Sequence, residues 1–243
     1  MDDQAGPVGQ EARVSLLFPK WLNALPTLGA GASVGGLATA VLGTWYFATP
    51  DFFEVGYMPH QPGTGFSHQI HAGKLGMDCR YCHTKVEQSA EANIPNVATC
   101  YGCHAENRLK AWGTQQVAFI REAYASDESI EWRRVHKLPD YVRNFPHHVH
   151  VNAGVSCFSC HGQIIGMPEV TQAHSLAMGW CLDCHRDPEA SLVPRDKVTD
   201  LIWVESEWMS QPVGQRVHAG VTPADLLASL EQAPPQNCGA CHH

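Results

Sequence analysis

Five copies of the motif C-x-x-C-H constrain this chain more than any other feature of its sequence. All ten cysteines fall into pairs with two residues between the partners, and a histidine directly follows each pair. The motifs are, in chain order, Cys79, Cys82 and His83; Cys100, Cys103 and His104; Cys157, Cys160 and His161; Cys181, Cys184 and His185; and Cys238, Cys241 and His242. No cysteine is left over, so the pattern is a property of the whole chain.

The chemistry of haem c accounts for this spacing. Two thiols three positions apart can form thioether bonds with the two vinyl groups along one edge of a haem. The imidazole of the following histidine then lies over the iron and can be its proximal ligand. Structural zinc sites and disulfide frameworks also use paired cysteines, but neither needs a histidine directly after the second cysteine five times. The sequence therefore predicts five covalently bound haem c groups.

A second histidine pattern precedes two of the motifs. His68 and His71 precede the first motif, and His147 and His150 precede the third, each pair with the spacing H-x-x-H. Electron-transfer haems usually have a second axial ligand, and histidines three apart lie on one face of a helical turn. We therefore expect these four histidines to be distal ligands of four haems. An ordinary pair of surface histidines is the alternative.

The histidine pattern belongs to an internal repeat. Each unit, residues 66–104 and 145–185, holds one H-x-x-H pattern and two C-x-x-C-H motifs, and the fifth motif, residues 238–242, follows in an extension. Alternating strand patterns are scarce, whereas residues 117–124 have helical spacing and residues 222–225, TPAD, are typical of a helix start. We expect a multihaem fold of mainly short α-helices and loops wrapped around haems, with little β-structure.

The N-terminal part contains a long uncharged segment. No charged residue occurs from Trp21 to Pro50, which exceeds the about 20 apolar residues needed to span a bilayer. Aromatic residues lie near both ends, as at membrane interfaces. We expect an uncleaved transmembrane helix, with a buried soluble helix as the alternative. The predicted domains are a cytoplasmic tail at residues 1–20, the anchor at residues 21–50 and a periplasmic pentahaem domain at residues 51–243.

The expected anchor carries a stripe of small residues. Gly31, Gly35, Thr39 and Gly43 recur at every fourth position. Such stripes let helices approach closely in lipid, so we predict a partner within the membrane. General tolerance of glycine in membrane helices is the alternative.

The charge of the chain excludes one class of partner. The formal net charge is −8, and charged residues make up 16% of the sequence. Nucleic-acid binding depends on clustered Lys and Arg, so we expect no nucleic-acid partner.

Four phrases of the sequence resemble a known family. They are FSHQIHAGKLGMDCRYCH, EANIPNVATCYGCH, RVHKLPDYVRNFPHHVHVNAGVSCFSCHG and SLAMGWCLDCHRD. They resemble the pentahaem, membrane-anchored cytochrome c subunit of bacterial alternative complex III, whose haem units are similar to class III multihaem cytochromes. The resemblance implies electron transfer from quinol-oxidising membrane subunits to a periplasmic acceptor. It also implies an iron–sulfur subunit and a monohaem cytochrome c subunit as partners.

Four distal histidines leave one haem without a second ligand. His174 and Met178 are one helical turn apart just before Cys181, and either could reach a haem. The phrase AMGWCLDCH resembles the family segment and favours Met178 as the fifth distal ligand, which would raise the potential of that haem. A Met178 that only packs in the core is the alternative, with His136 or His218 then as the ligand.

Two other functions remain open from the sequence. A stand-alone, membrane-anchored multihaem quinol dehydrogenase needs a haem with an open or weakly held distal side near the membrane. A multihaem reductase, such as a nitrite reductase, needs a five-coordinate catalytic haem. The sequence offers five proximal histidines and ten further histidines, which favours pure electron transfer without a catalytic residue.

Overall fold

The computed structural model describes residues 19–53, 55–106, 108, 117–138, 142 and 145–242. The chain divides into two compact units, Met1–Ala48 and Thr49–His243. Most of the expected N-terminal tail, residues 1–18, lies outside the described residues.

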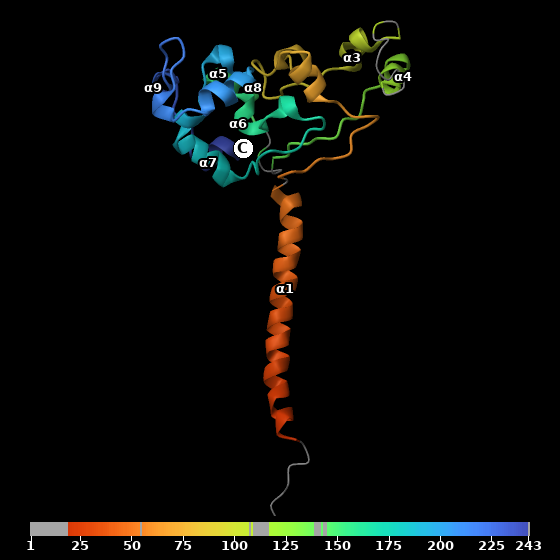
Figure 1. Ribbon diagram of the computed structural model, residues 1–243, viewed down its shortest axis with the longest axis vertical. Coiled ribbons are helices and arrows are strands. Elements are labelled where there is room, and N and C mark those ends of the chain that lie inside the picture. Colours follow the sequence, from red (N-terminus) through yellow and green to blue (C-terminus); the bar gives the residue numbers. More distant parts are fainter. Residues whose placement is uncertain are drawn as a thin grey trace, which may run out of the picture. The chain divides into compact units, whose positions relative to one another are not determined.

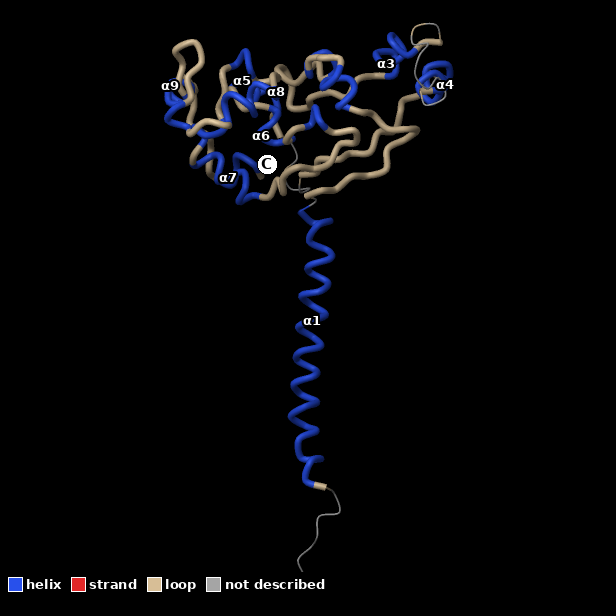
Figure 2. The backbone as a smooth tube through the Cα atoms, viewed as in Figure 1, coloured by secondary structure: helices blue, strands red, loops and turns tan. Residues whose placement is uncertain are grey.

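The first unit is dominated by one helix, α1 (Leu25–Phe53), which follows a short 3₁₀ turn, η1 (Lys20–Ala24). Figure 1 and Figure 2 show α1 as one long helix. Pro26 stands in its first turn, where a backbone N–H has no partner to lose. The span Trp21–Trp45 has 25 residues and a mean hydropathy of 1.4, so it is long and apolar enough to cross a membrane. None of its most apolar window is buried inside the protein. The expected apolar helix is therefore present.

The second unit consists of short helical segments joined by loops (Figure 2). Among its described residues there is no β-strand, only the isolated bridges Val155↔Leu192 and His218↔Val221. The expected fold class is confirmed. The segments are η2 (Gln69–Lys74), α2 (Cys79–Cys82), α3 (Val97–His104), α4 (Ala118–Ser126), α5 (His147–Ala153), α6 (Cys157–His161), η3 (Ile164–Gly166), α7 (Met178–Arg186), η4 (Pro188–Ser191), η5 (Arg195–Lys197), α8 (Leu201–Trp203), η6 (Val204–Met209), η7 (Val213–Gln215), α9 (Pro223–Ala228) and α10 (Cys238–Cys241).

Helix caps position the cysteine motifs. Asp78, Asn96 and Ser156 are the N-caps of α2, α3 and α6, and each side chain accepts a hydrogen bond from a backbone N–H in the first turn. A capped first turn fixes where a short helix begins. In α2 and α6 that helix begins at the first cysteine, so both thiols of the motif share one turn.

Two helices expected from the sequence are present. α9 begins with a capping box between Thr222 and Asp225. Helix α4 forms where residues 117–124 have helical spacing, and Ile120 is buried in it. Tyr124 of α4 stacks on Tyr101 of α3 with ring centroids 3.8 Å apart.

The protein core of the second unit is small. Its apolar cluster consists of Val86, Val151, Val193, Val198, Val204 and Trp208. The first repeat unit contributes one of these residues, the second another, and the segment after residue 187 the rest. The Trp208 indole donates to the Leu192 carbonyl at 2.9 Å. A core of this size agrees with the expectation that bound porphyrins supply much of the buried apolar surface.

Candidate haem sites

Each of the five motifs lies on a short helix of the second unit. The second motif forms the end of α3, where Cys100 is half-buried and Cys103 is exposed. The fourth motif lies on α7, with Cys184 half-buried, and the fifth forms α10. His242 is the C-cap of α10, and its N–H donates to the carbonyl of Cys238 at 2.9 Å. The cysteines and the histidine of a motif thus share one helical turn, as attachment to one haem requires.

Three pairs of histidine rings face each other across gaps of similar size. Each pair joins a histidine of an H-x-x-H pattern to the histidine of a C-x-x-C-H motif. The ring centroids are 6.5 Å apart for His68 and His83, 6.0 Å for His71 and His104, and 6.2 Å for His150 and His185. A metal–imidazole bond is about 2 Å long, so two imidazoles on opposite sides of one metal hold their centroids about 6 Å apart. The three gaps therefore fit a haem iron with two axial imidazoles.

Backbone carbonyls hold five of the predicted ligand imidazoles by their Nδ1 atoms. A carbonyl only accepts, so Nδ1 carries the proton and the lone pair of Nε2 stays available for a metal. The pairs are His71 with Ser67 (2.8 Å), His83 with Asn93 (2.6 Å), His147 with Ala90 (2.6 Å), His150 with Pro146 (3.0 Å) and His185 with Pro235 (2.6 Å). This arrangement is the one that haem ligation requires.

A phenylalanine orients the histidines in each repeat unit. Phe66 stacks on His71 at 4.4 Å and meets the edge of His68 at 4.8 Å. Phe145 stacks on His150 at 4.4 Å and meets the edge of His147 at 5.0 Å. The interplanar angle is 22° in both stacked pairs. The same short sequence pattern thus produces the same local geometry twice.

Burial keeps several of these imidazoles neutral. Desolvation lowers the pKa of His68 and His136 to about 4. It also lowers the pKa of His104, His150 and, most strongly, His161. Only a neutral imidazole offers a lone pair to a metal, so these side chains are ready to bind iron at neutral pH.

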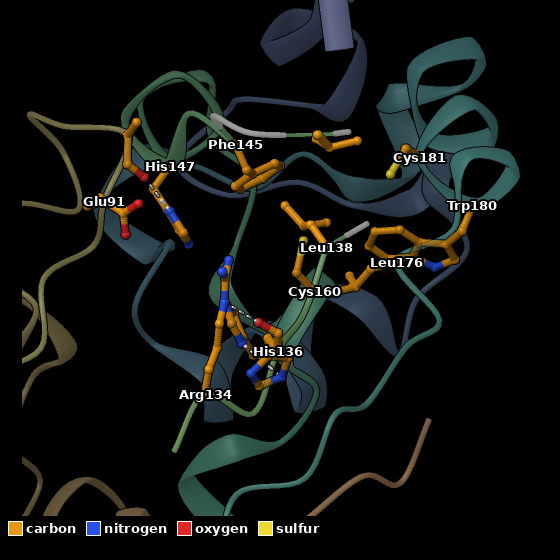
Figure 3. A pocket seen from close by; sticks show the side chains of 13 residues that line it. Glu91, Arg134, His136, Leu138, Phe145, His147, Cys160, Leu176, Trp180 and Cys181 are labelled. Carbon is orange, nitrogen blue, oxygen red and sulfur yellow. Dashed lines mark hydrogen bonds between the residues drawn. The ribbon is translucent and has the colours of Figure 1, made fainter. Parts of the chain in front are cut away.

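The third motif borders a pocket that is partly open to solvent (Figure 3). Cys160 and His161 of the motif line it together with His147, and His136 lies beside them. Burial raises the pKa of the Cys160 thiol to about 12, so this thiol is neutral. The pocket brings together two attachment cysteines, Cys160 and Cys181, with the proximal histidine of the third motif and two further histidines.

His136 lies against His161 rather than facing it across a metal-sized gap. Its Nε2 is 3.2 Å from Nδ1 of His161, the ring centroids are 4.2 Å apart, and the rings are nearly perpendicular at 77°. No metal fits between rings at this separation. The structure therefore places His136 behind the proximal histidine.

The remaining candidates for the fifth distal ligand lie elsewhere. Met178 begins α7, and its side chain is 62% exposed. His174 stacks on Trp180 at 5.3 Å. His218 meets the edge of Trp203 at 4.8 Å and lies 3.5 Å from Asp196. Both of these histidines are thus packed against tryptophan rings, whereas Met178 is exposed.

Sequence reasoning missed the groups that hold the ligands. The carbonyls of Ala90, Asn93 and Pro235 fix three imidazoles. Every residue has a carbonyl, so no sequence signal could single these out. The contact between His136 and His161 joins positions 25 residues apart and was equally invisible.

Comparison with known proteins agrees with this geometry. Residues 143–243 match the family described as cytochrome c7 and related cytochrome c. Over 128 residues the chain is 30% identical to the "Menaquinone reductase, multiheme cytochrome c subunit" of Nitratidesulfovibrio vulgaris. The aligned region covers 53% of this chain and 56% of that protein. The chain thus spans about half the length of this curated relative. Residues 143–243 are thus similar to cytochrome c7 and related cytochromes c, and the five C-x-x-C-H motifs agree with several bound haem c groups.

Proposed function

We propose that this multihaem cytochrome c is the electron-transfer subunit of a membrane quinone oxidoreductase complex, connecting its quinone-reactive subunits to a periplasmic acceptor through five haem c groups. The observation that carries the proposal is the set of facing imidazoles at 6.0–6.5 Å. Such a pair fills both axial positions of an iron, which suits electron transfer and leaves no position for a substrate.

The ligand assignment follows from the same geometry. The proximal ligands are the histidines of the five motifs, and the thioether bonds use the ten cysteines. His68, His71 and His150 are the distal ligands of the first, second and fourth haems. By the repeat, His147 serves the third haem. Met178 remains our proposal for the fifth, because the phrase AMGWCLDCH resembles the family segment and Met178 is exposed. Thioether ligation would raise the potential of that haem.

The attachment sites are neighbours in the order second, first, third, fourth, fifth, because a contact connects each consecutive pair. His68 and His71 share one turn, which links the first two sites. The Cys79 and Cys157 thiols lie within hydrogen-bonding reach, which raises the pKa of Cys157 and links the first site to the third.

Two further contacts connect the third, fourth and fifth sites. Cys160 and Cys181 line the same pocket, which links the third site to the fourth (Figure 3). Nδ1 of His185 donates to the carbonyl of Pro235, three residues before α10, which links the fourth site to the fifth. Bound haem supplies one-electron chemistry, and the protein keeps the neighbouring sites close enough for electrons to pass between them.

The N-terminal helix supports a membrane location. We assign residues 21–50 as a single-pass anchor in the bacterial cytoplasmic membrane, residues 1–20 as a cytoplasmic tail and residues 51–243 as the periplasmic haem domain. The exposed apolar surface of α1 is what a helix in lipid needs.

The partners are proposed from the two resemblances. The sequence phrases resemble the subunit of alternative complex III, which implies quinol-oxidising membrane subunits, an iron–sulfur subunit and a monohaem cytochrome c. A second candidate is electron delivery toward menaquinone, which the similarity to the menaquinone reductase subunit of N. vulgaris favours. Both candidates share a multihaem subunit that serves a quinone-reactive complex.

Purification in mild detergent tests the proposal. We expect membrane subunits and an iron–sulfur subunit to co-purify with the chain, and quinol to reduce its haems only within that complex. Menaquinone reduction by the complex from a periplasmic donor, without quinol oxidation, would select the second candidate. Steady quinol oxidation by the full chain alone would contradict the proposal and indicate a stand-alone quinol dehydrogenase.

A further inference from the structure

The histidine of the third motif is held differently from two of its counterparts. Nδ1 of His83 and Nδ1 of His185 each donate to a backbone carbonyl at 2.6 Å. Nδ1 of His161 instead lies 3.2 Å from Nε2 of His136. A side chain thus takes the place that a carbonyl has at the first and fourth sites.

The ring geometry excludes His136 as the axial partner of His161. The facing pairs have centroid distances of 6.0–6.5 Å, whereas these two rings are 4.2 Å apart and nearly perpendicular. His136 meets the Nδ1 edge of His161. The Nε2 atom of His161, on the other edge of the ring, stays available for the iron.

The direction of the hydrogen bond follows from the role of His161. An imidazole that offers Nε2 to a metal carries its proton on Nδ1. Nδ1 of His161 therefore donates, and Nε2 of His136 accepts. His147 is free of this contact, because its own Nδ1 donates to Ala90 at 2.6 Å, and it lies on the wall of the same pocket (Figure 3).

The backbone around His136 is held on both sides. The Arg134 side chain donates through Nε to the carbonyl of His136 at 3.0 Å. The N–H of Lys137 donates to the side-chain oxygen of Gln172 at 3.0 Å, and Gln172 is 1% exposed. An acceptor anchored in this way has little freedom to move away from His161.

We propose that His136 is a positioning residue of the third haem site, where it fixes the tautomer and ring plane of the proximal ligand His161. This inference rests on the proposed haem-binding function of the third motif. An outer hydrogen bond of this kind raises the basicity of a metal ligand. A more basic ligand stabilises ferric iron, so His136 lowers the potential of one haem among five.

The test uses the full chain with its haems attached, followed by redox titration and electron paramagnetic resonance. We expect His136→Phe to shift the reduction equilibrium of one haem about tenfold toward the ferrous form, which is about 59 mV for one electron. The other components should keep their potentials, and all haems should stay low-spin. His136→Gln, whose amide oxygen can accept the same hydrogen bond, should restore most of the original potential. His60→Phe, at an exposed histidine outside every motif, is the matched control.

Two results would overturn the inference. A new high-spin signal in His136→Phe or His136→Gln would mean that His136 is a distal ligand. Potentials unchanged in both variants would mean that it has no influence on His161. If His136→Phe does not fold, His136→Gln alone decides, since a low-spin spectrum with a small shift of one component is expected. No readout uses quinone, so failure of the proposed quinone function would leave these results interpretable.

Discussion

Helix α5, which carries two predicted distal ligands, ends at Gly154. This glycine is the C-cap of α5 and has a φ of 95°, in the left-handed region that glycine adopts at little cost. Its carbonyl accepts from the N–H of Val193 at 2.8 Å. A Cβ atom built at this position would lie 2.6 Å from the carbonyl oxygen of Val193. Gly154→Ala therefore combines backbone strain with a clash against another segment of backbone.

The two costs can be estimated separately. Left-handed backbone costs a residue with a side chain about 1–2 kcal/mol, and inserting a methyl group into tight packing costs about 1–3 kcal/mol. Gly154→Ala should therefore lose about 2–5 kcal/mol of unfolding free energy. At about 2–4 °C per kcal/mol for a chain of this size, Tm should fall by about 4–20 °C.

Gly220→Ala provides the matched control. Gly220 also has a positive φ, 82°, but a Cβ there would meet no atom within 4 Å. This variant should lose only the strain cost, about 1–2 kcal/mol. Thermal unfolding followed by circular dichroism, at equal haem content, measures both variants. Equal losses in the two variants would refute the argument, because the clash with Val193 would then contribute nothing.

Four further predictions follow from the chain. Intact-mass analysis should find five haems c, and four or fewer would contradict the assignment of the motifs. Gly35→Leu should loosen association with membrane partners while haem attachment stays intact; a complex that stays whole in detergent would show that the small-residue stripe is not a contact. Hydrogen bonds from Arg80 lower the pKa of Asp78 to about 2. This carboxylate therefore stabilises the fold above the usual aspartate pKa of about 3.9, and the stabilisation is lost as pH falls toward 2. Asp78→Asn should flatten that part of an acid unfolding curve, and an unchanged curve would count against the salt bridge. Met178→His should remove the highest-potential component of a redox titration, whereas an unchanged titration would exclude Met178 as a ligand.

The sequence predicted those elements whose cause is local. The uncharged stretch forms a long helix because no proline stands between Pro26, in the first turn, and Pro50, near the C-terminal end. Helix α9 begins at its capping box because Thr222 and Asp225 are three residues apart. The class of short helices and loops was equally predictable, since the motifs demand haems and the chain lacks strand alternation. No tertiary contact was needed for any of these predictions.

The pairing of the histidines depends on tertiary structure. From spacing alone, His68 and His71 were expected to serve two haems, but not which motif each would face. The structure places them opposite His83 and His104. His136 was an open candidate for distal ligation, and only the fold shows it on the Nδ1 side of His161. Contacts between residues far apart in sequence, in which backbone carbonyls are the partners, produce no recognisable sequence pattern.

The histidine pairs also explain how a domain with so small an apolar core can keep its haem ligands at defined spacings. His68, at the N-cap of η2, and His71, within it, face two different motifs, so the spacing between these two distal ligands is set locally. Phe66 and Phe145 stack on the second histidine of each pair with the same geometry, which sets the ring planes locally as well. Each motif needs only a capped turn to present its cysteines and histidine. Short local turns therefore present the ligands, whereas long-range contacts, such as His147 with Ala90 and His185 with Pro235, and the apolar cluster around Trp208 bring those turns together.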